Sequence, residues 1–436
     1  ISKSMSKKYL FLIAILFLSL SSFAQETEIR NRYAELDELL GVNSFFDNHL
    51  TGFMLYDLDS QWVMYERNSH MNFIPASTTK LLTFYASLVV LKDSTVSFRY
   101  VNNGDEITIW GSGDPSWKYT PLPQPKLKEF FSPYKKVNLS LDNWKDTSFG
   151  YGWQWDDYYY AYSAERFPLP VYGNIVTFTN TNKIPVPNIP MFRSMVVRSD
   201  KEIRGVQRDF NSNSFHYNPS LYVNPYATLP FITTPDLMAK LLEESLGKPV
   251  TLTKGKIPAH AKTFKGGTLT PLWREMLQES DNFVSEQILL MVSDQLFGEL
   301  NTERTIEYIK KNYFSDMPDY PQWVDGSGLS RHNLVTPRSM VTLMTKLDQL
   351  MPRSQLMQLL PQGGINGTIK NNYKAPRPYV FAKTGTISNN HALVGLVKGN
   401  SGKVYAFAFM NNNYLNKASE IRREMEKVMI YIKEHF

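Results

Sequence analysis

The chain of 436 residues contains no cysteine, which excludes disulfide bonds and thiolate metal sites. It has no low-complexity tract, no internal repeat and no basic run of the kind that binds nucleic acid. A P-loop and the Gly-x-Ser-x-Gly elbow of α/β-hydrolases are also missing, so nucleotide-dependent and α/β-hydrolase chemistry are not indicated. The seven histidines show no metal-ligand spacing such as His-Glu-x-x-His, so we expect no metal and no cofactor.

Long apolar runs are scarce, and the first one is typical of a secretory signal. Lys7 and Lys8 precede an apolar stretch from Leu10 to Leu20, and a small-residue cleavage site, Ser22-Phe23-Ala24, follows. The stretch is too short for a stable membrane anchor, and the absence of cysteine excludes a lipoprotein. We therefore expect residues 1–24 to be removed and the protein to be exported, with the periplasm as its destination and no transmembrane anchor.

The size and charge of the chain fit an exported globular protein. Its length is enough for two or three domains with a well-buried core. Loss of Lys3, Lys7 and Lys8 with the leader lowers the formal charge from +6 to +3. That mild positive charge is consistent with work near an anionic cell wall or membrane, without identifying a partner.

The periodicity of apolar residues predicts an α+β fold in which both ends of the chain build one antiparallel sheet. Early strands are expected at Thr51–Asp57 and Trp62–Glu66 and late ones at Tyr379–Ile387, Ala392–Lys398 and Lys403–Asn411. The stretch from Ser97 to Tyr226 changes character to short strand-like runs with many turns, which indicates an inserted, mostly β domain. Helices are predicted at Glu26–Leu40, Ser77–Leu91, Thr234–Ser245, Leu272–Gln278, Asp281–Gly298, Thr302–Tyr313, Pro337–Leu350 and along the C-terminal stripe from Ile421 to Phe436.

The stretch Pro75-Ala76-Ser77-Thr78-Thr79-Lys80 opens an apolar run and carries a candidate nucleophile. On a helix, Ser77 and Lys80 lie one turn apart on the same face. A buried lysine with a lowered pKa could then take the proton of the serine hydroxyl. The same spacing occurs at Ser4–Lys7 and Ser132–Lys135, so this motif alone is weak.

Two further motifs follow in a fixed order, Ser280-Asp281-Asn282 and Lys383-Thr384-Gly385. Each is weak alone, but the trio in this order is the one found in penicillin-binding proteins and serine β-lactamases. The predicted contexts agree, because the motifs fall at a helix start, in a loop before a long helix and on a strand beside a hairpin.

The trio contains the groups that acyl transfer needs. Ser77 would be the nucleophile and Lys80 its base, and Ser280 could relay a proton to the leaving amine because a hydroxyl both donates and accepts. Asn282 could hold the peptide backbone of the substrate. Backbone N–H groups of Ser77 and Thr386 would form the oxyanion hole.

The third motif supplies the expected carboxylate clamp. Lys383 would set a positive potential, and the hydroxyls of Thr384 and Thr386 could bind a C-terminal carboxylate. Gly385, without a side chain, would let the substrate strand approach the backbone closely.

The chain resembles the class C low-molecular-mass penicillin-binding proteins, which are D-alanyl-D-alanine carboxypeptidases and endopeptidases. Four further stretches look like signatures of that family and extend the resemblance from about residue 45 to the C-terminus: Gly111-Ser112-Gly113-Asp114-Pro115, Gly152-Trp153-Gln154-Trp155-Asp156-Asp157, Asp325-Gly326-Ser327-Gly328-Leu329-Ser330-Arg331 and Gly364-Ile365-Asn366-Gly367-Thr368.

The resemblance implies a transpeptidase/β-lactamase-like domain in two parts, residues 25–96 and 231–436, around an insertion at 97–230. Ser280 follows Ser77 by only 203 residues, which suggests a trimmed insertion of one subdomain. The resemblance also implies that Asp157, Tyr162 and Arg331 face the side chain of the third residue of a stem peptide. Asp157 and Tyr162 could equally pack within the insertion, and Arg331 could form a structural ion pair.

Three functions are compatible with these residues. The first is a serine-type D-Ala-D-Ala carboxypeptidase and DD-endopeptidase that acts on peptidoglycan stem peptides through an acyl-enzyme on Ser77 and is acylated by β-lactams such as penicillin. The second is a serine β-lactamase, and the third is a catalytically inactive peptidoglycan-binding protein. The large insertion and the 325–331 signature favour the first over the second, and the intact trio argues against the third.

Overall fold

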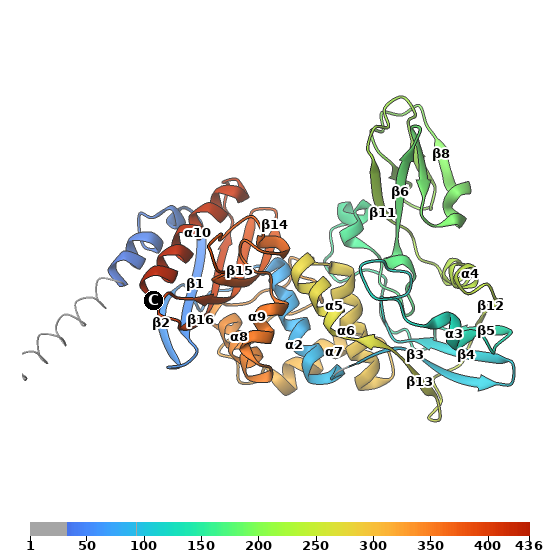
Figure 1. Cartoon of the computed structure of the whole chain (residues 1–436), viewed down its shortest axis with the longest axis horizontal. Helices are drawn as coiled ribbons and strands as arrows, with labels where there is room; N and C mark the ends of the chain where they lie inside the picture. The colour runs from blue at the N-terminus through green and yellow to red at the C-terminus, as the bar shows by residue number, and fades with distance from the viewer. Residues whose placement is uncertain (1–32, 93) are drawn as a thin grey trace, which may run out of the picture.

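The computed structural model describes residues 33–92 and 94–436. The predicted signal segment lies outside them, as does most of the predicted first helix, of which residues 33–40 are helical. Figure 1 shows an elongated molecule with a sheet at one end, helices in the middle and the insertion at the other end. Within the described ranges, no helix combines the length and the apolar character needed to cross a membrane.

One five-stranded antiparallel sheet is built from both ends of the chain, as the periodicity predicted. The strand order is β14-β15-β16-β1-β2, so β1 from the N-terminal part pairs with β16 from the C-terminal part. The early strands are β1 (Leu50–Asp57) and β2 (Trp62–Arg67), and the late ones are β14 (Val380–Ile387), β15 (Asn390–Lys398) and β16 (Val404–Asn412). The predicted hairpin through 399–402 joins β15 to β16.

Both faces of this sheet are covered, and the alternation along β16 shows how. Tyr405, Phe407 and Phe409 point into a core shared with helix α10 (Ala418–His435). Ala406 and Ala408 point the other way, into the core under the central helices. Because side chains of a strand alternate between faces, large residues meet one helix and small residues allow several helices to approach.

The central helices form the second layer. A short 3-10 turn precedes the first of them, and a π-helical turn precedes the longest. Their bounds are η2 (Ala76–Thr79), α2 (Lys80–Leu91), α5 (Thr270–Arg274), η7 (Glu275–Glu279), α6 (Asn282–Phe297), α7 (Thr302–Tyr313), α8 (Pro337–Leu350) and α9 (Arg353–Leu359).

Local signals explain where several of these helices begin and end. The side chain of Asp281 accepts a hydrogen bond from Val284 N at the start of α6, and Gly298 ends the helix with a φ of 66°. Thr336 caps α8 in the same way, with proline in the first turn. Within the described residues, the predicted helices agree with the observed ones except at two positions. The α-helix predicted from residue 77 begins at Lys80 after the 3-10 turn, and the helix predicted at 272–278 is divided into α5 and η7.

The insertion carries three further sheets, which Figure 1 shows as two lobes beyond the central helices. The lower lobe holds a five-stranded sheet in the order β12-β5-β4-β3-β13, and the upper lobe holds two sheets, β11-β6-β7 and β8-β10-β9. Their bounds are β3 (Ser94–Asn103), β4 (Glu106–Gly111), β5 (Lys136–Ser140), β6 (Ile175–Thr181), β7 (Ile184–Pro187), β8 (Val196–Arg198), β9 (Gln207–Arg208), β10 (Phe215–Tyr217), β11 (Tyr226–Pro230), β12 (Val250–Thr253) and β13 (Lys262–Thr268).

The pairing of the strands leads us to propose a wider insertion than the predicted range 97–230. Its five-stranded sheet begins with β3 and is completed by β12 and β13, which form its two edges. Helix α4 (Pro235–Leu246), predicted to begin the second part of the catalytic domain, packs its Met238 and Leu241 into the apolar core of the insertion instead. We therefore place the insertion at residues 94–268. It contains three sheets, whereas the short separation of Ser77 and Ser280 had suggested a single subdomain.

Buried polar contacts attach the insertion to helix α6. The Gln287 side-chain amide donates to the carbonyls of Gly113 (2.7 Å) and Phe167 (2.9 Å), both in the insertion. Arg99 of β3 forms a bidentate ion pair with Asp294, which is buried on α6. The same helix begins beside Lys80, so the insertion is fixed against the element that positions the candidate active site.

Candidate active site

The candidate nucleophile lies in the 3-10 turn before α2. Ser77 Oγ is 3.0 Å from Lys80 Nζ, so the two residues meet as their spacing predicted. The turn is crowded by two glycines from distant parts of the chain. A Cβ on Gly328 would overlap the carbonyl of Ala76, and a Cβ on Gly385 would overlap the carbonyl of Pro75 and come within 3.0 Å of Ser77 N.

These contacts give Gly385 a structural role that the sequence did not indicate. Its missing side chain makes room for the turn that carries the nucleophile, while the close approach of a substrate strand stays a prediction. The same crowding accounts for the 3-10 geometry, because tertiary contacts on both sides override the local preference for an α-helix. Ala76, with a φ of 47°, adopts a left-handed conformation that is uncommon for a residue with a side chain.

Lys80 is fully buried and its amine is held by three acceptors. Besides Ser77 Oγ, Nζ donates to Asn282 Oδ1 at 2.6 Å and to the carbonyl of Ser327 at 2.7 Å. Burial lowers the pKa of Lys80 to about 8, against the opposing effect of the nearby carboxylates, Asp325, Asp281 and Glu286. A lysine tuned in this way can supply a neutral amine as a base near neutral pH.

The second lysine of the trio is equally buried and holds the second serine. Lys383 Nζ donates to Ser280 Oγ at 2.7 Å and to the carbonyl of Thr384 at 2.9 Å. Burial and the positive charge of Lys80 lower the pKa of Lys383 well below its usual value. Ser280 itself has a φ of 63°, which turns the chain sharply between η7 and α6. Its hydroxyl is thus oriented by Lys383, a contact the sequence did not predict.

A buried carboxylate network supports the base from behind. Asp325 accepts hydrogen bonds from Gly328 N, Ser330 N and Asn333 Nδ2, which fixes the loop of the 325–331 signature. Glu286 accepts from Ser327 N at 2.7 Å, and the carbonyl of Ser327 in turn accepts from Lys80. The loop therefore positions the amine of Lys80 and balances its charge.

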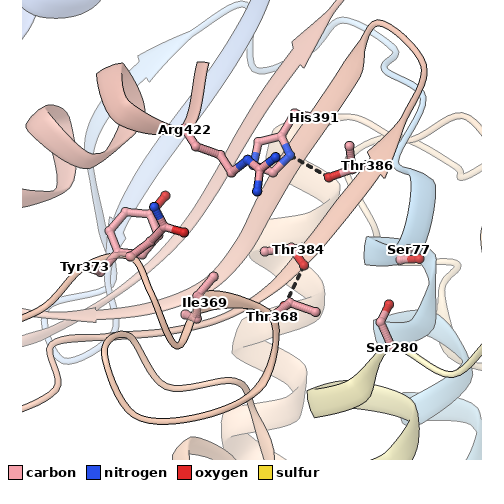
Figure 2. A pocket seen from close by; sticks show the side chains of 10 residues that line it. Ser77, Ser280, Thr368, Ile369, Tyr373, Thr384, Thr386, His391 and Arg422 are labelled. Atoms are coloured by element: carbon pink, nitrogen blue, oxygen red, sulfur yellow. Dashed lines mark hydrogen bonds between the residues drawn. The ribbon is translucent and has the colours of Figure 1, made fainter. Parts of the chain in front are cut away.

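A cleft of about 320 Å³ opens beside these groups. Figure 2 shows Ser77 and Ser280 at one side of it, with the two threonines of β14 along its floor. Thr384 Oγ1 donates to Thr368 Oγ1 at 2.7 Å, and Thr386 Oγ1 lies 2.8 Å from His391 Nδ1. The cleft is lined by Ser77, Ser280, Thr368, Ile369, Asn372, Tyr373, Thr384, Thr386, His391 and Arg422.

Several of these wall residues were not identified from the sequence. Thr368 ends a stretch that was recognised as a family signature, but no role was assigned to it. His391 is one of the seven histidines to which the sequence assigns no role, and Arg422 lies in the predicted C-terminal helix. One sequence signal could have indicated that His391 lines the site: it lies at the start of the predicted strand that follows the Lys-Thr-Gly strand. In the structure these two strands pair, and His391 lies opposite Thr386.

The three residues expected near the third position of a stem peptide lie outside the lining of the cleft, on a surface that we call the rim. Tyr162 is 46% exposed and its hydroxyl donates to Asp157 Oδ1 at 2.7 Å. The backbone carbonyl of Tyr162 accepts from Asn282 Nδ2 at 3.0 Å, which places this segment next to the catalytic groups. Arg331 forms no ion pair within the described ranges; its guanidinium donates to the carbonyl of Ser388, just past β14, at 3.4 Å.

Comparison with known proteins agrees with this geometry. Residues 33–433 match the model of the D-Ala-D-Ala carboxypeptidase 3 (S13) family. The chain is 22% identical over 415 residues to D-alanyl-D-alanine carboxypeptidase DacB of Haemophilus influenzae, covering 83% of this chain and 85% of that protein. It is 24% identical over 453 residues to the D-alanyl-D-alanine carboxypeptidase of an Actinomadura species, covering 91% of this chain and 83% of that one.

The fold is likewise shared with a solved structure. Penicillin binding protein 4 of Haemophilus influenzae superposes with a TM-score of 0.71 at 18% identity, covering 92% of this chain and 99% of that one. That similarity shows the transpeptidase-like fold. The family match over nearly the whole described chain shows common descent with the members of that family. The chain belongs to the D-Ala-D-Ala carboxypeptidase 3 (S13) family of serine peptidases.

Proposed function

We propose that this chain is a serine-type D-Ala-D-Ala carboxypeptidase, with DD-endopeptidase action on cross-linked stem peptides of peptidoglycan. One observation carries the proposal: Ser77 Oγ lies 3.0 Å from the amine of a fully buried lysine whose pKa burial lowers to about 8. A nucleophile and a base in hydrogen-bond contact, with the base oriented by further groups, are the arrangement expected for covalent catalysis. Membership of the S13 family supports the choice of substrate.

The residues suggest how acylation proceeds. Neutral Lys80 takes the proton of Ser77 as Oγ attacks the carbonyl of the D-alanyl bond, and the backbone N–H groups of Ser77 and Thr386 stabilise the oxyanion. The bond to the leaving amine then breaks, and Ser280 passes that amine a proton. The proton that Lys80 took from Ser77 replaces the one lost by the Ser280 hydroxyl, which Lys383 orients through its hydrogen bond, so that both lysines end as they began. Water hydrolyses the ester on Ser77, releasing the shortened peptide and restoring the hydroxyl.

Binding groups lie on both sides of the scissile bond. The hydroxyls of Thr384 and Thr386 line the cleft, where they would hold the terminal carboxylate in the field of Lys383. On the acyl side, Asn282 would hold the peptide backbone. Exposed Tyr162 and the half-buried residues Asp157 and Arg331 would face the side chain of the third residue, with Asp157 suited to an amino group.

The protein is expected to act outside the cytoplasm and to bind β-lactams. Its family acts on the cell wall, and the predicted leader directs export to the periplasm. A β-lactam complex of penicillin binding protein 4 of Haemophilus influenzae has been solved, and that structure superposes on this chain with a TM-score of 0.64. We therefore expect penicillin to acylate Ser77. The serine β-lactamase alternative is not favoured, since residues 33–433 match a carboxypeptidase family.

An intact-mass time course after addition of penicillin tests the proposal. We expect one persistent adduct that maps to Ser77, and D-alanine release from a pentapeptide in the absence of the drug. Ser77→Ala should remove both, with a loss of at least about 10⁴-fold. Ser132→Ala is the matched control, because exposed Ser132 has the same Ser-x-x-Lys spacing without a buried lysine.

Other outcomes would point elsewhere. Rapid loss of the adduct with turnover of the drug would indicate a β-lactamase. Folded protein with neither adduct nor hydrolysis would indicate an inactive wall-binding protein. Acylation that persists in the Ser77→Ala variant would refute the assignment of the nucleophile.

A further inference from the structure

The cleft continues past the threonines into a part for which the reaction has no use. Figure 2 shows Tyr373 and Arg422 on the opposite side of the cleft from Ser77 and Ser280, with Thr384 and Thr386 between them. A D-alanine leaving group has only a methyl side chain, and its carboxylate would be held by the threonines. The far end, lined by Asn372, Tyr373, His391 and Arg422, therefore remains available to something larger.

Arg422 brings an uncompensated positive charge to this far end. Its Nε donates to the carbonyl of Ala418 at 3.1 Å, one turn back on α10. Within the described ranges, its terminal guanidinium nitrogens form neither a hydrogen bond nor an ion pair. Other partly buried arginines of the chain do pair with carboxylates, for example Arg99 with Asp294 and Arg353 with Asp348.

The carboxylate next along the same face of α10 does not neutralise Arg422. Glu426, four residues on, accepts hydrogen bonds from Tyr373 N at 2.6 Å and from Asn372 Nδ2 at 3.5 Å. Its two oxygens thus hold the loop that forms the cleft wall. Arg422 is left with donors that face the cleft, where its planar fork is suited to a carboxylate.

Tyr373 adds a second unsatisfied donor. The residue is 1% exposed, and its buried hydroxyl has no hydrogen-bond partner among the described residues. A buried hydroxyl without a partner is costly, so its retention beside the cleft points to a ligand that completes it. Burial, together with the charge of Glu426, raises the pKa of Tyr373 above its usual value, which keeps the hydroxyl protonated and able to donate.

His391 does not compete for the same role. Burial, together with the charge of Arg422, lowers the pKa of His391 to about 3, so its ring is neutral at working pH. Its Nδ1 is already engaged with Thr386 Oγ1. The positive charge at this end of the cleft is therefore that of Arg422.

We infer that the Arg422 guanidinium and the Tyr373 hydroxyl form a subsite for a second carboxylate on the leaving group, beyond the carboxylate held by Thr384 and Thr386. Such a leaving group is a dicarboxylic amino acid, as in a cross-link whose leaving amine belongs to a diamino diacid that ends a second stem peptide, so that both of its carboxylates are free. The inference rests on the proposed function and deepens it, because it favours cross-links over terminal D-alanine.

Matched substrates test this subsite. Acyl peptides that end in D-Ala-D-Glu and in D-Ala-D-Gln differ only in the last side chain, which carries a carboxylate in the first and an amide of the same shape in the second. We expect kcat/KM for the D-Glu peptide to exceed that for the D-Gln peptide by about tenfold or more, the size of a charge-assisted hydrogen bond. In Arg422→Gln this ratio should fall towards one, and in Tyr373→Phe it should fall in part.

Arg423→Gln is the matched control, because Arg423 neighbours Arg422 on α10 but its side chain is 66% exposed and paired with Glu424. This variant should keep the wild-type ratio. Arg422→Glu should reverse the preference, so that a peptide ending in D-Ala-D-Lys is cleaved better than its D-Glu counterpart. That reversal keeps the test decisive even if Arg422→Gln is unstable.

A second readout separates this subsite from the proposed function. The same peptides should compete with penicillin for Ser77 and so slow its acylation. The D-Glu peptide should do this at about tenfold lower concentration than the D-Gln peptide, even where turnover is slow. A ratio near one in the wild type, or the same ratio in Arg422→Gln, would overturn the subsite while D-alanine release still upheld the peptidase. Failure of D-alanine release with intact carboxylate discrimination would overturn the peptidase alone.

Discussion

The two ends of the cleft differ in how their polar groups are satisfied. At the reacting end, the amine of Lys80 has three acceptors, and Lys383 holds Ser280. At the far end, the terminal nitrogens of Arg422 and the hydroxyl of Tyr373 have no partner among the described residues. The two amines and Ser280 at the reacting end are held in place before a substrate arrives, whereas the donors of the far end are satisfied by what binds.

The difference has a physical reason. Groups that transfer protons must be oriented before the reaction, because reorienting them in the transition state would add to the barrier. Groups that recognise a ligand gain most when the ligand satisfies them, since an unpaired buried donor costs about 1–3 kcal/mol. Variants at the reacting end should therefore reduce the rate for every substrate, and variants at the far end should change the choice of substrate.

The largest effect is expected when the base is removed. Lys80→Met should lower the rate of penicillin acylation by about 10³-fold, because the proton of Ser77 loses its acceptor. It also leaves Asn282 Oδ1 and the Ser327 carbonyl without their donor, so the melting temperature should fall. Stopped-flow acylation and thermal unfolding measure the two effects.

Lys135→Met is the control for that change, because the side chain of Lys135 is 83% exposed and belongs to the other serine-lysine pair. Its acylation rate should match that of the unaltered protein. Acylation by Lys80→Met within tenfold of the wild-type rate would mean that another group is the base.

A smaller effect is expected when the nucleophile turn is displaced. In Gly385→Ala the new Cβ would overlap the carbonyl of Pro75 and press on Ser77 N. We expect acylation to fall by about 10²-fold, since a small misplacement of reacting groups has costs of that order. In Gly267→Ala, where a Cβ would have no atom within 4 Å, the rate should be unchanged.

The charge network behind Lys80 should appear in the pH dependence of acylation. The rate should rise as Lys80 loses its proton, with a midpoint near pH 8. Burial raises the pKa of Glu286 to about 7, so near the midpoint this carboxyl is negatively charged and stabilises the protonated amine. Glu286→Gln should therefore move the midpoint to lower pH and raise the relative rate at pH 7 severalfold. A midpoint that stays or moves upward would contradict the coupling. Glu307→Gln, on the exposed face of α7, is the control.

The smallest effect is expected at the rim. Asp157→Asn removes a partly exposed carboxylate that is bonded to Tyr162, so kcat/KM for a peptide with a free amine on its third residue should fall about two- to fivefold. The same peptide with that amine acetylated should be cleaved equally by both proteins. Asp156→Asn serves as the control, and an equal loss on both peptides would indicate packing rather than recognition.

Much of the fold could be predicted because its signals are local. Helix α6 is flanked by Asp281 and Gly298, the cap residues that its sequence indicates. Strands β15 and β16 have long apolar stretches, residues 392–397 and 404–410, and a tight turn joins the two strands. The end of the insertion could not be predicted, because β12 is short and largely exposed and β13 contains two glycines and two lysines. They are strands because the edges of a sheet far back in the chain pair with them.

The sequence by itself determined the chemistry of the reacting end. The reaction requires the residue types of three short motifs, so the sequence alone predicts that these residues lie together in one site: Ser77, Lys80, Ser280, Asn282 and Lys383. Only the tertiary structure decided that Ser280 is held by Lys383 and that Gly385 accommodates the nucleophile turn. It also decided that Tyr373 and Arg422 share a cleft with Ser77, because α10 packs across the sheet. Such contacts depend on how distant elements pack, which no local pattern records.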